Sequence, residues 1–105
     1  YKKVKNGIFR IGIHHLWVSV SVHHPRYRAI QAAMAEWRRQ AGLSQTQLAQ
    51  RLVVGQSYVS KVERGEAYVD IILFADWCVA CGVQAGTALD RVLMAQSGSE
   101  EARNL

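Results

Sequence analysis

The sequence predicts an all-α bundle of five short helices behind an N-terminal extension. Three observations lead to this fold class. From residue 29 onward, apolar residues recur at the three- and four-residue spacing of one helix face. Glycines and capping residues divide this stretch into five pieces. The chain has 105 residues, 50% of them hydrophobic and 20% charged, which is the composition of one small globular domain.

Residues 16–22 are the exception to the helical pattern. Here Leu and Val alternate with Trp and Ser, which is the period of two that a strand shows. A single strand leaves its backbone hydrogen-bonding groups unpaired, so it would have to pair with residues 9–13 or with a second copy of the chain. The alternative is that the segment is disordered. We therefore assign residues 1–25 to an extension, strand-like or disordered, that is a candidate for pairing or dimerisation.

The first helix is expected over residues 29–40, which are rich in helix formers. Ile30, Met34 and Trp37 fall on one stripe of this helix and are expected to face the core. Gly42 then supplies a residue that tolerates the left-handed conformation in which helices end.

Ser44 followed by Gln47 is a capping-box pattern, which predicts the start of a second helix. This helix is expected to end near Leu52 or Val53, and a third helix spans residues 56–64 up to Gly65. The residues expected to face the core are Leu48, Ala49 and Leu52 in the second helix and Val59 and Val62 in the third.

Two further helices complete the expected bundle, one near residues 71–81 and one near residues 85–95, with Gly82 between them. Their inward residues are expected to be Ile71, Phe74, Trp77, Cys78 and Cys81, followed by Leu89, Val92 and Leu93. Residues 96–105 are polar and are expected to form a flexible tail. The helical domain is thus assigned to residues 26–95.

The charge of the chain is unevenly distributed. The net charge is +5. Residues 1–43 carry eight Lys and Arg against the single acidic residue Glu36, whereas residues 44–105 are slightly acidic. A basic half favours a polyanionic partner, with nucleic acid ahead of a membrane surface.

Residues 42–65 contain a succession of short motifs, namely Gly42-Leu43-Ser44-Gln45, Leu48-Ala49, Ser57-Tyr58-Val59-Ser60 and Glu63-Arg64-Gly65. This succession resembles the helix-turn-helix of the lambda-repressor/Cro-type family, also called the XRE family, and the similarity extends over residues 30–92. The resemblance implies a lambda-repressor-like, five-helix domain that binds double-stranded DNA sequence-specifically. It also implies a transcriptional regulator of the repressor kind, acting as a homodimer on a palindromic operator.

The third helix supplies the candidates for reading bases. Its face opposite Val59 and Val62 is polar, and Gln, Ser and Lys side chains bond base edges and phosphates in the major groove. The base-reading candidates are Gln56, Ser57, Ser60 and Lys61.

The DNA backbone would be held by a second group of residues. The start of the second helix offers free N–H groups to a phosphate, and the resemblance implies that Gln45 bonds that phosphate. The further backbone candidates are Arg39, Tyr58, Arg64 and Arg28.

Two positions in the motif affect its geometry. The resemblance implies an ion pair between Arg38 and Glu63, which would fix the recognition helix to the bundle. Val53 stands where the family usually has Gly, and a β-branched residue disfavours a positive φ. We therefore expect Gly55 to absorb the strained geometry, which leaves the start of the recognition helix open by about one residue.

A second chemistry has to be weighed at Cys78 and Cys81. With Trp77 they form a W-C-x-x-C sequence that resembles the motif of thioredoxin-like oxidoreductases, in which a helix N-terminus activates the first thiol. That fold needs further strands and a cis-proline after the motif, and no proline follows Cys81. Because both cysteines fall on an apolar helix stripe, we interpret them as core residues and keep a thiol-redox protein as the alternative.

The sequence predicts neither an enzyme nor a cofactor or metal site. The histidines come as adjacent pairs at 14–15 and 23–24, which on a strand point to opposite faces and do not give the spacing of a zinc site. We expect double-stranded DNA and a second copy as partners and a cytoplasmic, nucleoid-associated location. A membrane is not expected, because Arg10, His14 and His15 interrupt the most apolar stretch. An antitoxin-type module, which also binds a toxin-like protein, stays open as a further alternative.

Overall fold

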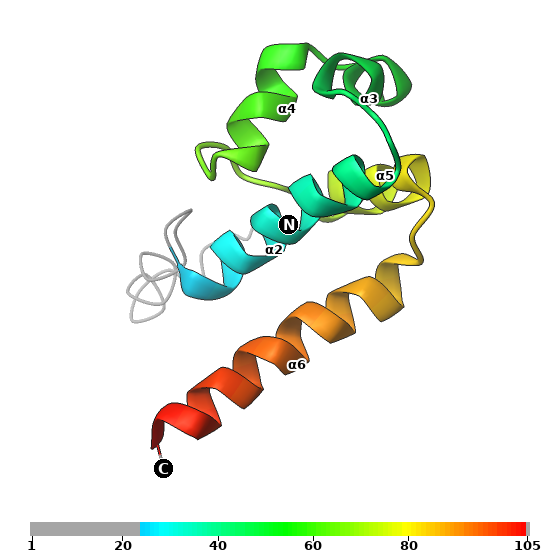
Figure 1. The fold of residues 1–105 in the computed structure, drawn as a ribbon. Coiled ribbons are helices and arrows are strands. Elements are labelled where there is room, and N and C mark those ends of the chain that lie inside the picture. Colours follow the sequence, from blue (N-terminus) through cyan, green and yellow to red (C-terminus); the bar gives the residue numbers. More distant parts are fainter. Residues whose placement is uncertain (1–23, 105) are drawn as a thin grey trace, which may run out of the picture.

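The computed structural model of the chain describes residues 24–104, and these form five helices and no strand (Figure 1). In chain order the helices are α2 (Pro25–Gln40), α3 (Gln45–Leu52), α4 (Gln56–Glu63), α5 (Ile71–Cys81) and α6 (Ala85–Asn104). The prediction of an all-α, five-helix fold is confirmed for this part of the chain. The strand expected at residues 16–22 lies outside the described residues.

The first two helices begin where local capping chemistry allows. Pro25 occupies the first turn of α2, where its missing N–H costs nothing, so α2 starts four residues before the predicted residue 29. At the start of α3, Ser44 Oγ accepts from the Gln47 N–H at 3.0 Å, and Gln47 Oε1 accepts from the Ser44 N–H at 2.8 Å. The predicted capping box is therefore confirmed.

The turn between α3 and α4 differs from the prediction. Val53 itself adopts the left-handed conformation, with φ 58° and ψ 49°, whereas Gly55 is extended with φ −79°. The expectation that Gly55 would absorb the strain is thus wrong. The Val53 side chain is 88% exposed, so the turn can form around it without a steric conflict against the core, and the Val54 N–H closes the turn on the Ala49 carbonyl at 3.0 Å. As a result α4 begins at Gln56.

Two further features of the C-terminal half differ from the predictions, namely the end of the last helix and the burial of Ile71. The last helix does not end near Ala95 but continues to Asn104, because no proline stops it and extending a formed helix costs little per residue. Ile71, expected in the core, is 70% exposed. Ile71 is the first residue of α5 and is exposed like the next residue Ile72, whereas Leu73 packs against the core and Phe74 is buried.

The core lies where α2, α3, α4 and α5 meet. Its fully buried side chains are Met34, Leu48, Val59, Val62, Trp77 and Cys78. The Trp77 Nε1–H donates to the Met34 carbonyl at 2.9 Å, which ties α5 to α2 and satisfies the buried indole. Ala49 is the small residue that lets α3 approach α4, the pair of helices with the closest association.

Figure 1 shows how the five helices of the described residues are arranged around this core. α3 and α4 form an angled pair at one end of the molecule, and α6 extends away from the other end. Within the described part of the chain, no single helix has the length and hydropathy to span a membrane. α5 and residues 85–96 have the required length and hydropathy only when they are taken together. These two segments are bent by 106° relative to one another at the break between them.

The strain at Val53 gives the first testable prediction. Replacing Val53 by Gly should raise the free energy of unfolding by about 0.5–1 kcal/mol. The reason is that the left-handed conformation costs a residue with a Cβ about 1–2 kcal/mol, and the greater flexibility of unfolded glycine offsets part of that gain. Urea denaturation followed by circular dichroism measures the change.

Gly82→Ala is the matched control, because Gly82 ends α5 at φ +74° with no atom within 4 Å of an added Cβ. This variant should lose about 1 kcal/mol for conformational reasons alone. A destabilised Val53→Gly protein would show instead that the turn depends on the valine side chain.

Candidate nucleic-acid interface

α4 has one buried side and one polar side. Val59 and Val62 are fully buried and attach the helix to the core. Gln56, Ser57 and Lys61 are exposed, and Ser60 is partly exposed. The spacing of these four polar residues places them together on the side opposite the valines. The structure therefore brings the four sequence-predicted base-reading candidates onto one face.

A buried ion pair fixes the end of α4. Arg38 Nε donates to Glu63 Oε2 at 2.6 Å, and Arg38 Nη2 donates to Glu63 Oε1 at 3.0 Å. The two side chains are only 12% and 6% exposed. Arg38 Nη1 also donates to the Leu43 carbonyl at 2.7 Å, and the hydrogen bonds to Glu63 raise the pKa of the guanidinium. The pair thus joins α2, α4 and the loop that precedes α3.

The ion pair continues into two amides that reach the surface. Gln45 Nε2 donates to Glu63 Oε1 at 2.9 Å, and Gln56 Nε2 donates to Gln45 Oε1 at 2.7 Å. Each amide therefore has a defined orientation, because only its nitrogen can donate. Of the two hydrogens on Gln56 Nε2, one points to Gln45, while the second and the Oε1 atom have no partner among the described residues.

Two of the backbone candidates are cations that carry their own carboxylates. Arg39 Nη1 lies 3.0 Å from Glu36 Oε1, and both side chains are more than half exposed. Arg64 donates to Glu66 through Nε at 3.1 Å and through Nη2 at 3.0 Å, and it also donates to Ser60 Oγ. These hydrogen bonds lower the pKa of Glu66. Because the pairs are exposed, each contributes little to stability and can be exchanged for another anion.

Two other backbone candidates are placed differently. The Tyr58 ring packs against the core, and its hydroxyl donates to the Tyr68 carbonyl at 3.4 Å, so it is directed toward the α4–α5 loop. Arg28 is exposed but lies on the first turns of α2, about 16 Å of helix rise from Arg39. The structure does not group Arg28 with the residues around α4.

The two cysteines lie in the core rather than at a reactive position. Cys78 is fully buried, Cys81 is 8% exposed, and both lie in the second half of α5, away from its N-terminus. Burial raises the pKa of both thiols, that of Cys81 to about 11. A thiol-redox site needs the opposite shift, so this geometry does not support the alternative. Within residues 24–104, no three His, Cys, Asp or Glu side chains come together to hold a metal ion.

The sequence did not reveal the contacts among these residues. The hydrogen bonds from Gln45 to Glu63 and from Gln56 to Gln45 join positions 18 and 11 residues apart, and no periodicity encodes them. Glu66 as the partner of Arg64 was also missed, although two opposite charges two residues apart were a visible signal.

The comparisons with known proteins agree with this geometry. The profile of the helix-turn-helix family matches residues 34–86. The structure is similar to the XRE-family like protein from Pseudomonas syringae pv. tomato str. DC3000, with 36% identity, 70% of this chain and 90% of that chain covered, and a TM-score of 0.66.

Two regulators show the same fold. The clp gene regulator ClgR from Corynebacterium glutamicum has 26% identity over 77% of this chain and 89% of its own, with a TM-score of 0.64. The hypothetical transcription factor NHTF from Neisseria has 27% identity over 67% of this chain and 79% of its own, with a TM-score of 0.56. No curated protein matches the chain.

The Arg38–Glu63 pair can be tested by a double-mutant cycle. Removing one partner leaves a buried charge uncompensated, so Arg38→Met or Glu63→Gln alone should lower the free energy of unfolding by about 3 kcal/mol. The double variant should lose less than the sum, with a coupling of at least about 1 kcal/mol. Urea denaturation gives the three differences, and additive losses would mean that the two side chains do not stabilise each other.

The burial of the thiols predicts their reactivity. At pH 7.5, iodoacetamide should modify Cys78 and Cys81 far more slowly in the native protein than in urea, because the thiols are buried and their raised pKa values keep them protonated. Since the folded protein holds these protons to higher pH than the unfolded chain, stability should fall as pH rises above about 9. Native alkylation at the rate of a free thiol would favour the redox alternative.

Proposed function

The chain belongs to the XRE family of helix-turn-helix proteins, and on this basis we propose that it is a DNA-binding transcription regulator that represses from a specific operator. In this proposal α4 enters the major groove with its polar face toward the base edges. The protein acts by binding and not by catalysis, on the nucleoid in the cytoplasm.

The observation that carries the proposal is the orientation of the Gln56 amide. Its one hydrogen bond within the described residues runs to Gln45, which leaves one N–H donor and the Oε1 acceptor without partners there. A glutamine in this state matches adenine, whose N6 amino group donates and whose N7 accepts in the major groove. We assign the reading of an A·T pair to Gln56, with Ser57, Ser60 and Lys61 contacting the neighbouring bases.

The DNA backbone is assigned to the residues that flank α4. Gln45 stands at the first turn of α3, where free N–H groups and the helix dipole favour a phosphate. Arg39 and Arg64 add charge, and a phosphate can replace Glu36 or Glu66 as their partner because both ion pairs are exposed. Tyr58 and Arg28 are assigned only peripheral contacts to the DNA backbone. The Tyr58 hydroxyl is directed toward the α4–α5 loop, and Arg28 lies far from α4, in the first turns of α2.

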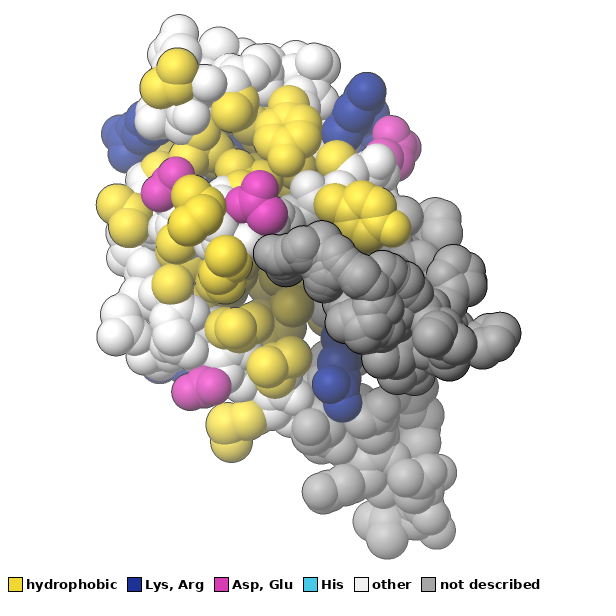
Figure 2. Space-filling model, turned by 180° about the vertical axis from the view of Figure 1, so that it is seen from behind, with side chains coloured by type: hydrophobic (Ala, Val, Ile, Leu, Met, Phe, Trp, Pro, Cys, Tyr) yellow, Lys and Arg dark blue, Asp and Glu magenta, His cyan; other side chains and the backbone are white. Residues whose placement is uncertain are grey.

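A homodimer on a palindromic site completes the proposal. The two recognition helices of a dimer must lie about 34 Å apart to enter successive turns of the major groove on one face of the duplex. Large apolar side chains are exposed at Tyr68, Ile71, Ile72 and Met94, and Figure 2 shows hydrophobic side chains gathered on the back of the molecule. Exposed apolar surface of this kind favours contact with a second copy, through α6 or through residues 1–25.

Binding selection from a random DNA pool at stated salt, followed by titration of variants, tests the proposal. The selected site should be palindromic, with two chains bound per duplex. Gln56→Ala should weaken binding to it by about 1–3 kcal/mol and relax the preference at one A·T pair in each half-site. Fluorescence anisotropy of labelled duplexes provides the affinities.

Arg39→Gln is the matched comparison, because it removes a phosphate contact and no base contact. This variant should weaken binding to all sequences alike and reduce the slope of log K against log salt by about 1. If Gln56→Ala also weakened all sequences equally, Gln56 would not read a base. If no sequence were enriched at all, the proposed function itself would fail.

A further inference from the structure

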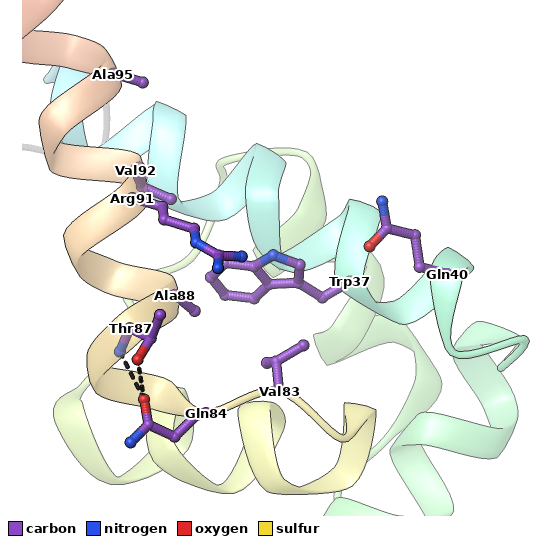
Figure 3. A pocket seen from close by; sticks show the side chains of 9 residues that line it. All are labelled: Trp37, Gln40, Val83, Gln84, Thr87, Ala88, Arg91, Val92 and Ala95. Atoms are coloured by element: carbon purple, nitrogen blue, oxygen red, sulfur yellow. Dashed lines mark hydrogen bonds between the residues drawn. The ribbon is translucent and has the colours of Figure 1, made fainter.

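A groove between α2 and α6 has the features of a ligand site. It has a volume of about 590 Å³, which lies within the range of small-molecule pockets in proteins. Trp37 comes from α2, Gln84 from the turn before α6, and Arg91 and Val92 from α6 (Figure 3). No residue of α3 or α4 lines it, so the groove is separate from the proposed DNA surface.

The floor of the groove is apolar and held in place. Trp37 and Val83 form it together with Ala88 and Val92. The Trp37 ring packs edge-on against Phe74, with 6.0 Å between the ring centroids and 70° between the planes. Such a contact with the core fixes the ring before any ligand arrives. The groove can therefore bury the apolar body of a ligand without first ordering its own floor.

Two of the hydrogen-bond donors at this groove, on Arg91 and Trp37, have no partner among the described residues. Arg91 is the only charged side chain in the lining, and it forms no ion pair with any residue that the structure describes. The Trp77 indole donates to Met34, whereas the Trp37 indole N–H has no acceptor in the described part of the chain. Figure 3 shows the Arg91 side chain reaching from α6 toward the Trp37 ring. Both donors thus line the same groove.

Together these features indicate the chemical class of ligand that the groove would bind. A guanidinium that forms no ion pair with a described residue, together with an N–H, attracts an anion, and a planar carboxylate is matched by the two parallel N–H groups of one arginine. The apolar floor requires that the rest of the ligand be aromatic or aliphatic. We propose that the groove between α2 and α6 binds a small amphipathic carboxylate, with its carboxylate on Arg91 and the Trp37 N–H and its apolar body on the Trp37 ring.

The test uses 4-phenylbutyrate as the probe and the full chain labelled with ¹⁵N. Addition of the probe should shift the Trp37 indole N–H resonance, which is identified by its loss in Trp37→Phe, along a saturable curve. Arg91→Gln should weaken binding at least tenfold, as should replacement of the probe by the uncharged 4-phenylbutanamide. Arg91 is exposed, so the variant should keep the thermal midpoint of the parent.

Arg26→Gln is the control variant, because Arg26 is an exposed cation at the start of α2 and does not line the groove. It should bind the probe like the parent. Equal affinity of Arg91→Gln and the parent would overturn the proposal, as would the absence of a saturable shift. A Trp37 resonance that moves with protein concentration and is insensitive to the probe would also overturn it, because a second copy of the chain would then occupy the groove. None of these outcomes depends on DNA binding.

Discussion

The Arg38–Glu63 ion pair is the interaction on which the arrangement of the DNA-facing side chains depends. α4 has only eight residues, and two buried valines hold its inner side. The apolar packing of these valines and of the Tyr58 ring is not directional, whereas a bidentate pair with two defined distances restrains rotation about the helix axis. Because Arg38 also binds the Leu43 carbonyl, the same side chain fixes the loop from which α3 starts. One guanidinium thus adds to the core packing that sets the relative position of α3 and α4.

The cost of this arrangement is visible at Val53. The short turn between α3 and α4 requires a left-handed residue, and the chain has a β-branched one there. The conformation persists because the helices on both sides are fixed by the core and by the ion pair. An alternative turn centred on Gly55 would shift the start of α4 and move Gln56 away from Gln45. Local backbone strain is therefore tolerated in order to keep the two amides in contact.

Most of the fold could be predicted from the sequence, and the reasons are local. Helix stripes such as Val59 and Val62, capping by Ser44 and the left-handed glycine at Gly42 each follow from spacing or residue type alone. Positions that depend on tertiary packing could not be predicted. Ile71 continues the apolar stripe of α5 in sequence, yet it is exposed, while Phe74 on the same stripe is buried against the other helices.

Gln31 shows the same limit for a polar residue. It is buried because Nε2 donates to the Ala67 carbonyl at 2.6 Å, a contact across 36 residues that no pattern signals. The candidate site follows the same division. Its residue types could be predicted from a helix face, but the hydrogen bonds that orient Gln45 and Gln56 depend on how three helices meet.

Two polar side chains at opposite ends of α4, Gln56 and Arg64, are held by interactions of different strength, and this difference bears on how the proposed interface reads DNA. At the start of the helix, Gln56 is connected through Gln45 to a buried ion pair, so its orientation is set before DNA arrives. At the end, the Arg64 side chain is held by the exposed Glu66 and by the Ser60 hydroxyl, and it can change partner at small cost. Preorganised groups favour one base over another, because a wrong base leaves them unpaired, whereas adaptable groups follow the phosphate backbone of any sequence. Specificity should therefore be concentrated at the Gln56 end of α4, and general affinity at the Arg64 end.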